Sequence, residues 1–105
     1  MVTVTFARIL PEREQQLREW LADLNARQSE VRASLADEGV RQEQIYILPT
    51  SDGPVLVYAM DAVDVQRAFA AFSASNAPID QQHRAVLAEV TSGPIAVETL
   101  YDCLV

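Results

Sequence analysis

His83 is the only side chain in the sequence whose ordinary pKa lies close to neutral pH. It lies in the segment S-N-A-P-I-D-Q-Q-H-R at residues 75–84. If a helix begins at Pro78, a spacing of about 100° per residue aligns His83 with Ile79 and Val90. We therefore expect the imidazole on the apolar, inward face of that helix. There it could bind a ligand or act as a catalytic acid or base.

A structural role for His83 is the simpler alternative. The sequence gives it no fixed nucleophile and no second ligand residue, and buried histidines are commonly hydrogen-bonded within the core. A backbone carbonyl or a strand hydroxyl would be a sufficient partner. Both alternatives remain open at this point.

Asp80 and Arg84 flank the same face. Asp80 falls in the first turn of the expected helix, where a carboxylate can cap the amino end. The spacing from Asp80 to Arg84 is i to i+4, so the two can form a surface ion pair. Arg84 is also a candidate ligand-binding residue beside His83.

Three further polar residues are candidates for a ligand site. Gln28 interrupts the apolar stripe of the first helix, and Tyr46 and Tyr58 lie in expected strands. If the helices pack side by side, Gln28 and His83 could face one cavity. Alternatively, Gln28 lies in water, and the tyrosines pack with only their hydroxyls exposed.

Metal, phosphate and cofactor sites have no support in the sequence. One histidine and one cysteine twenty residues apart do not supply a ligand set, so no metal is expected. The three glycines occupy turn or cap positions, and none belongs to a phosphate-binding loop. We expect no cofactor.

Length and charge narrow the class of protein. The 105 residues carry a net charge of −7 and predict a single domain over residues 1–105. A negative surface repels phosphate, so neither nucleic acid nor an anionic membrane is an expected partner. No apolar segment is long enough to span a membrane. The lone Cys103 indicates a reducing compartment, and we expect the cytoplasm.

The order of the elements predicts the fold. Strands are expected at residues 2–10, 40–48, 55–60 and 95–101, with helices at residues 11–38, from Asp61 to about residue 73, and from Pro78 to about residue 91. The first helix would be about 40 Å long, so it either breaks or projects beyond the core. The string β-α-β-β-α-α-β is that of a ferredoxin-like split βαβ fold: an antiparallel, four-stranded α+β sheet with helices on one face.

The second face of this sheet would remain uncovered. The strands carry apolar residues on both sides, and a large exposed apolar surface usually marks a partner site. We expect two chains to pack through their open sheet faces as a homodimer. The alternative is that a helix or the chain's own tail covers this face.

Three segments of the sequence resemble those of a known family. The segment S-x-x-P-I-D-x-x-H-R, together with R-E-W at residues 18–20 and E-G-V at residues 38–40, is similar to an uncharacterised domain-of-unknown-function family of small prokaryotic α+β proteins. That family resembles the dimeric α+β barrel group, which includes antibiotic-biosynthesis monooxygenases, muconolactone isomerases and haem-degrading enzymes. The resemblance implies a fold and a dimer, but no particular reaction.

Two functions fit these observations. One is a dimeric binding or regulatory module that holds a small apolar or aromatic ligand. The other is a cofactor-independent, monooxygenase-like or isomerase-like enzyme with His83 as general acid or base. We favour the binding module, because the sequence supplies no partner that would tune the histidine.

Overall fold

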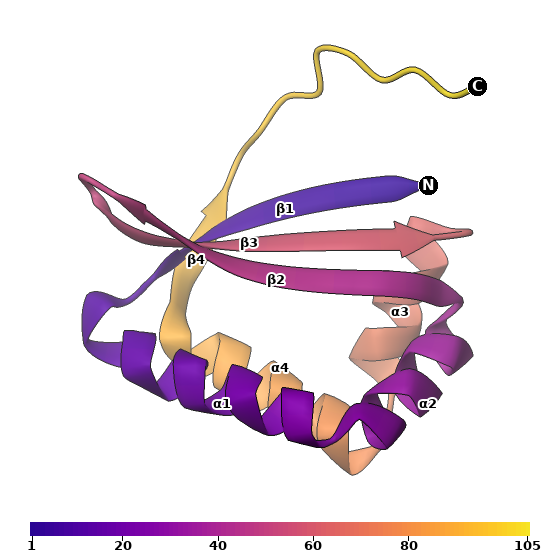
Figure 1. The fold of residues 1–105 in the computed structure, drawn as a ribbon, viewed down its shortest axis with the longest axis horizontal. Helices are drawn as coiled ribbons and strands as arrows, with labels where there is room; N and C mark the ends of the chain where they lie inside the picture. The colour runs from indigo at the N-terminus through magenta and orange to yellow at the C-terminus, as the bar shows by residue number, and fades with distance from the viewer.

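The computed structural model describes residues 1–105 and has four strands and four α-helices. In chain order they are β1 (Val2–Ile9), a short 3-10 helix η1 (Pro11–Arg13), α1 (Glu14–Ala26), α2 (Gln28–Glu38), β2 (Val40–Thr50), β3 (Gly53–Ala62), α3 (Val65–Ala74), α4 (Pro78–Val90) and β4 (Thr91–Ile95). The strands form one antiparallel sheet in the order β2-β3-β1-β4. All four helices lie on one side of it (Figure 1). The predicted ferredoxin-like α+β fold is confirmed.

The long first helix breaks into α1 and α2. Arg27 separates them with φ −114° and ψ 42°, outside the helical range. The break lets α2 turn up toward the sheet near the start of β2, so the helix pair does not project as one straight rod (Figure 1). Helix α2 ends at Gly39, whose φ of 73° lies in the left-handed region that glycine adopts without a steric penalty.

Three predicted boundaries were wrong. The last strand covers Thr91–Ile95 instead of residues 95–101, because it pairs directly after α4 without an intervening turn. Helix α3 is capped by Asp64, whose carboxylate accepts from the Arg67 amide, and not by Asp61. Asp61 remains in β3 and pairs with the N-terminal amine. None of the four helices is long and apolar enough to cross a membrane.

The core lies between the sheet and the helices in two apolar clusters. One contains Ile9, Leu17, Leu56 and Val90, and the other Val40, Met60, Ala62 and Ala68. Leu56 and Met60 point to the same face of β3, because strand side chains alternate, and Tyr58 lies between them on that face. Tyr58 therefore places a polar hydroxyl group on the helix-covered face, between two apolar core residues.

Candidate functional site

His83 occupies an aromatic box beneath the sheet. Helix α4 begins at Pro78, whose fixed φ and missing N–H suit the first helical turn. The histidine lies on the inward face of α4 and is only 5% exposed, as predicted. The rings of Trp20, Tyr58 and Phe72 surround it, with centroids 5.9, 6.3 and 5.5 Å from that of the imidazole. The ring is therefore largely removed from water.

The partner of His83 is an indole. Trp20 Nε1 donates to His83 Nδ1 at 2.7 Å, so Nδ1 carries no proton and the proton of the neutral ring lies on Nε2. Burial lowers the pKa of His83 to about 4, against the opposing effect of the nearby Asp80 carboxylate. Nε2 itself has no hydrogen-bond partner. The site thus contains a buried, neutral N–H donor without an acceptor.

Asp80 lies inside the protein and not on the helix surface. It is 6% exposed and accepts from two hydroxyls, Ser34 Oγ at 2.6 Å and Ser75 Oγ at 2.5 Å. The amino end of α4 has Ala77 as its N-cap, with no side-chain cap. The predicted roles of Asp80 as a helix cap and as the surface partner of Arg84 were therefore wrong, because its carboxylate is taken up by the serines of α2 and the α3–α4 connection.

Arg84 closes the end of α3. Its guanidinium donates to the carbonyls of Phe72 at 2.5 Å and Ser75 at 2.8 Å, and it lies 5.6 Å from the centre of the Phe72 ring. Carbonyls in the last turn of a helix have no partner within the helix. Arg84 supplies that partner and fixes α4 against α3. Its two terminal nitrogens make these contacts, and Arg84 does not line the cavity beside His83.

Glu38 and Asp80 share one serine. Ser34 Oγ lies 3.0 Å from Glu38 Oε1 and 2.6 Å from Asp80 Oδ1, yet a hydroxyl has one proton to donate. The arrangement is satisfied when Glu38 is protonated and donates to Ser34, which then donates to Asp80. Burial, aided by the charge of Asp80, raises the pKa of Glu38 to about 7. A large fraction of Glu38 is therefore a neutral acid at neutral pH.

A hydrogen-bonded tyrosine and glutamate lie on the sheet. Tyr58 of β3 donates its hydroxyl proton to Glu43 of β2. Burial raises the pKa of both groups above their ordinary values. Neither Glu38, Glu43 nor Asp80 forms an ion pair with a basic side chain. Asp80 and Glu43 accept from hydroxyl donors alone, and as carboxylates they give the site a negative potential.

Two neighbouring spaces lie beside these groups. The smaller is a cavity of about 30 Å³, whose polar lining residues are Ser34, Glu38, Glu43, Tyr58, Asp80 and His83. The larger is a cleft of about 180 Å³, lined by Thr5, Glu38, Tyr58, Met60, Phe69, Phe72 and Leu87. Glu38, Tyr58 and Phe72 line both, so the mostly apolar cleft borders the cavity beside His83.

Two predicted ligand-binding residues are not part of this site. Gln28 is exposed at the start of α2 and lines a groove of about 200 Å³. This groove borders the cavity beside His83 through Leu24, Val31, Leu35 and Glu43, but His83 does not line it. The predicted cavity shared by Gln28 and His83 was wrong, because the break at Arg27 ends the stripe that would have aligned them. Tyr46 is 51% exposed on the side of the sheet away from the helices. Of the predicted tyrosines, only Tyr58 reaches His83.

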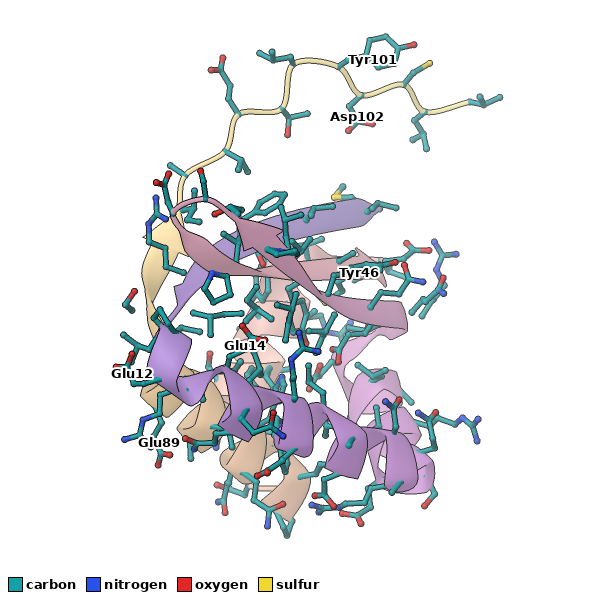
Figure 2. All side chains as sticks on the ribbon, turned by 60° about the vertical axis from the view of Figure 1, so that its left-hand side comes forward. Glu12, Glu14, Tyr46, Glu89, Tyr101 and Asp102 are labelled. Atoms are coloured by element: carbon teal, nitrogen blue, oxygen red, sulfur yellow. The ribbon has the colours of Figure 1, made fainter.

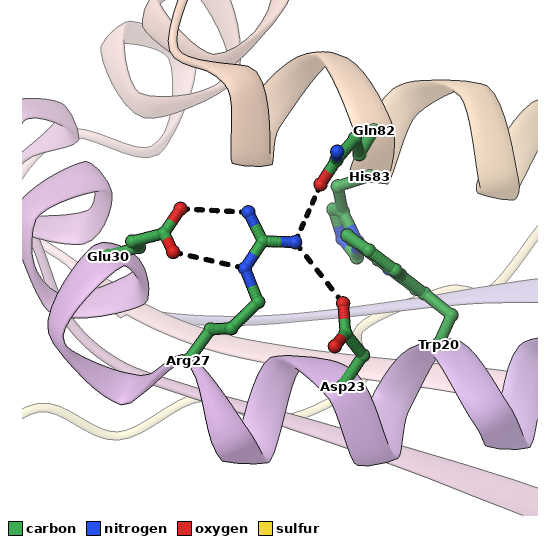
Figure 3. A network of polar contacts seen from close by, with 6 residues as sticks. All are labelled: Trp20, Asp23, Arg27, Glu30, Gln82 and His83. Carbon is green, nitrogen blue, oxygen red and sulfur yellow. Dashed lines mark hydrogen bonds and ion pairs between the residues drawn. The ribbon is translucent and has the colours of Figure 1, made fainter.

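The helix break also carries a surface cluster next to the site. Arg27 donates to Asp23 at 3.1 Å, to Glu30 at 2.8 Å and to the side chain of Gln82 on α4 at 2.6 Å (Figure 3). Its guanidinium carbon lies 6.0 Å from the centre of the Trp20 ring. The cluster connects α1, α2 and α4 directly above the indole, and so helps to hold the indole against His83.

The sequence analysis overlooked Ser34, Glu38 and Glu43. Glu38 follows Leu35 by three residues, so it continues the inward stripe of its helix. Glu43 alternates with Ile45 and shares its face of the strand. The sequence therefore places both Glu38 and Glu43 at positions where an apolar residue would be expected. Ser34 gave no such signal, since serine is common on helix surfaces.

Comparison with known proteins supports the fold and gives no activity. A search of curated proteins found no match. Among solved structures, the chain is similar to that of Rv0793 from Mycobacterium tuberculosis, with 18% sequence identity, a TM-score of 0.57, and coverage of 98% of this chain and 97% of that one. At this level of identity the likeness concerns the fold alone. The model of a family of unknown function, DUF6176, matches residues 1–103, and the chain belongs to that family.

Proposed function

We propose that this protein is a binding module for a small aromatic molecule that carries one hydroxyl group. The observation that carries the proposal is the buried Nε2–H of His83, which has no acceptor. His83 lines the small cavity, which borders the apolar cleft through the shared residues Glu38, Tyr58 and Phe72. Buried donors without partners are rare and call for an explanation. A ligand oxygen in the cavity would satisfy this one.

A hydroxyl matches the groups around the cavity. It can accept a hydrogen bond from His83 Nε2 and donate one to a carboxylate such as Glu43. A carboxylate or phosphate on the ligand would instead meet the negative potential of Glu43 and Asp80. A protonated amine would leave the histidine proton unpaired. The chemistry therefore selects a neutral alcohol or phenol.

The size of the cleft limits the ligand to about one ring. An apolar cavity of about 150 Å³ holds a benzene molecule, and this cleft has about 180 Å³. Its walls supply the rings of Phe69 and Phe72 and the aliphatic side chains of Met60 and Leu87. The adjoining cavity of about 30 Å³ is large enough for a hydroxyl group or a water molecule.

The enzymatic alternative fits less well. A general base needs an unprotonated nitrogen facing its substrate, but His83 Nδ1 is occupied by Trp20 and Nε2 holds the proton. The low pKa of about 4 also leaves no protonated imidazole to act as an acid near neutral pH. His83 is suited to orient a ligand rather than to transfer a proton.

Binding of simple ring compounds tests the proposal. We expect phenol and benzyl alcohol to shift the amide NMR signals of Thr5, Phe69 and Leu87, with at least tenfold weaker binding of toluene and no binding of benzoate. His83→Phe should abolish the preference for phenol over toluene, whereas Gln28→Ala should bind as the parent does. Glu43→Gln, which keeps an acceptor, is a second variant in case His83→Phe does not fold. Equal affinity for phenol and toluene, or no binding at millimolar concentrations, would refute the proposal.

A further inference from the structure

We infer that Glu38 links ligand binding to the uptake of a proton. The site holds its neutral ligand while Glu38 is protonated and releases the ligand when Glu38 ionises. This regulation rests on the proposed function, because it acts on the same ligand site. The position of Glu38, its one hydrogen bond and the charges around it each support the coupling.

Glu38 lies beside the space that a bound ring would fill. It is the last residue of α2 and is only 7% exposed. Among the three carboxyl groups that line the cavity beside His83, Glu38 alone also lines the apolar cleft. Asp80 and Glu43 line the cavity but not the cleft. A ring that fills the cleft therefore packs beside Glu38 and displaces water from around it.

A single hydroxyl proton serves two carboxyl groups next to the cleft. Ser34 Oγ lies 3.0 Å from Glu38 Oε1 and 2.6 Å from Asp80 Oδ1. When Glu38 is protonated, it donates to Ser34, and Ser34 donates to Asp80. When Glu38 is ionised, the Ser34 proton satisfies only one of the two carboxylates, and the shorter contact is that with Asp80. No other hydrogen bond in the protein includes the Glu38 side chain, so its ionised form depends on water.

The surroundings of Glu38 carry no compensating positive charge. The titratable side chains that line the cavity with it are Asp80 and His83 of α4, Glu43 of β2 and Tyr58 of β3. Helices α1 and α3 contribute only apolar side chains to the two spaces, and no ion pair includes Glu38. Burial raises the pKa of Glu38 to about 7, and the negative charges of Asp80, Glu43 and Asp37 act in the same direction. Both forms of Glu38 are therefore populated near neutral pH.

A neutral ligand cannot replace the water that an ionised Glu38 needs. The cleft of about 180 Å³ has room for water molecules that donate to the carboxylate while the site is free. An alcohol that displaces them brings one hydroxyl proton, which Glu43 accepts in the proposed mode of binding. A buried carboxylate without a donor is far less stable than the neutral acid. The bound state therefore favours protonated Glu38, and linkage requires that binding raise the pKa of Glu38.

The affinity for the ligand therefore falls as the pH rises through about 7. Below this value Glu38 is already protonated in the free protein, so binding takes up no proton and the affinity is highest. Above it, binding must be accompanied by proton uptake, and the affinity falls by up to about tenfold per pH unit. Burial lowers the pKa of His83 to about 4, so His83 stays neutral over this range and contributes no pH dependence.

Binding of benzyl alcohol at two pH values tests the coupling, because its hydroxyl group does not titrate in this range. NMR titration of the parent should give a Kd at least about tenfold higher at pH 8.5 than at pH 6. Glu38→Gln keeps the shape of the side chain, and its amide N–H can replace the carboxyl O–H as donor to Ser34. This variant should bind equally at both pH values, with an affinity close to that of the parent at pH 6. The control Glu12→Gln changes an exposed carboxyl group outside both spaces and should keep the pH dependence of the parent (Figure 2).

Calorimetry of the parent provides a second measurement that needs no variant. Titration with benzyl alcohol at pH 8, in two buffers with different ionisation enthalpies, should show uptake of about half a proton or more per ligand. Equal affinity at pH 6 and 8.5, or binding without proton uptake at pH 8, would overturn the coupling and leave the binding function standing. A pH dependence that persists in Glu38→Gln would overturn the role of Glu38. No binding at either pH would refute the binding function itself, and the coupling with it.

Discussion

Each face of the sheet contains an exception to the usual distribution of polar and apolar side chains. Beneath the helices, Glu38, Asp80 and His83 are 7, 6 and 5% exposed. On the open face, Tyr46 and Leu48 are 51 and 47% exposed. A polar group inside a protein needs a hydrogen-bond partner, and an apolar group outside needs a cover.

The two faces therefore differ in whether their exceptional side chains already have partners within the protomer. On the helix side, serines and an indole satisfy almost every buried group, and His83 Nε2 is the exception. On the open side, no helix packs on the sheet, so apolar side chains such as Tyr46 and Leu48 are available for association. We therefore expect substitutions under the helices to affect stability and substitutions on the open face to affect assembly.

Asp80→Ala should give the largest effect. It removes the acceptor of two buried hydroxyls, and hydrogen bonds to a charged group contribute about 1.5 to 3 kcal/mol each. We expect the free energy of unfolding to fall by about 3 kcal/mol, measured by urea titration. Asp23→Ala removes an exposed carboxylate of α1 and serves as the control, with a loss below about 1 kcal/mol. Equal losses in the two variants would show that the buried network contributes no stability.

The indole–imidazole bond should have the next largest effect. Trp20→Phe leaves His83 Nδ1 buried without a donor, at a cost of about 2 kcal/mol. His83→Leu and the double variant complete a thermodynamic cycle. We expect a coupling energy of about 1 kcal/mol or more, because losing both partners together is less costly than losing one. Additive losses would mean that the bond makes no net contribution.

Glu38 should make stability depend on pH. Its pKa rises from 4.5 in the unfolded chain to about 7 in the folded one, so the folded state binds more protons between these pH values. The Glu38 contribution to the free energy of unfolding therefore falls as pH rises from 4.5 to 7, by up to about 3 kcal/mol.

The pKa of His83 falls from 6.5 to about 4, so its contribution increases with pH between 4 and 6.5 and partly cancels that of Glu38. Comparison with Glu38→Gln isolates the carboxyl, because both proteins contain His83. The stability of Glu38→Gln relative to the parent should increase from pH 4.5 to 7. A difference that does not vary with pH would mean that folding does not raise the pKa of Glu38.

Tyr46→Ser should have the smallest effect on folding. The side chain is half exposed and packs only across the sheet, so the free energy of unfolding of the protomer should change by less than about 1 kcal/mol. Denaturant titration at low protein concentration would measure this change. A loss as large as that of Asp80→Ala would remove the distinction between the two faces.

The sequence predicted the fold well because its signals are local. Apolar periodicity, Pro78 and Gly39 placed most helices and strands, and the order of elements then allowed few topologies. The break at Arg27 had no glycine or proline to mark it. The start of β4 was missed because Gly93 and Pro94 usually indicate a turn, whereas here they lie in a strand.

The site was harder to predict because its contacts join distant parts of the chain. Helical spacing alone turned His83 inward, but its partner Trp20 lies 63 residues away. Ser34 and Asp80, 46 residues apart, gave no mutual signal. The segments that carried the family resemblance nevertheless supply the network: Trp20, Glu38, Ser75, Asp80, His83 and Arg84. Their residue types fit packing partners, which explains why no reaction could be assigned from them.

Nitrogen NMR of the imidazole tests the central claim most directly, and the single histidine makes its signals unambiguous. The account predicts that the proton lies on Nε2, that Nδ1 accepts from the indole, and that neither signal titrates until the pH approaches 4. A proton on Nδ1, or a titration midpoint near 6.5, would contradict it.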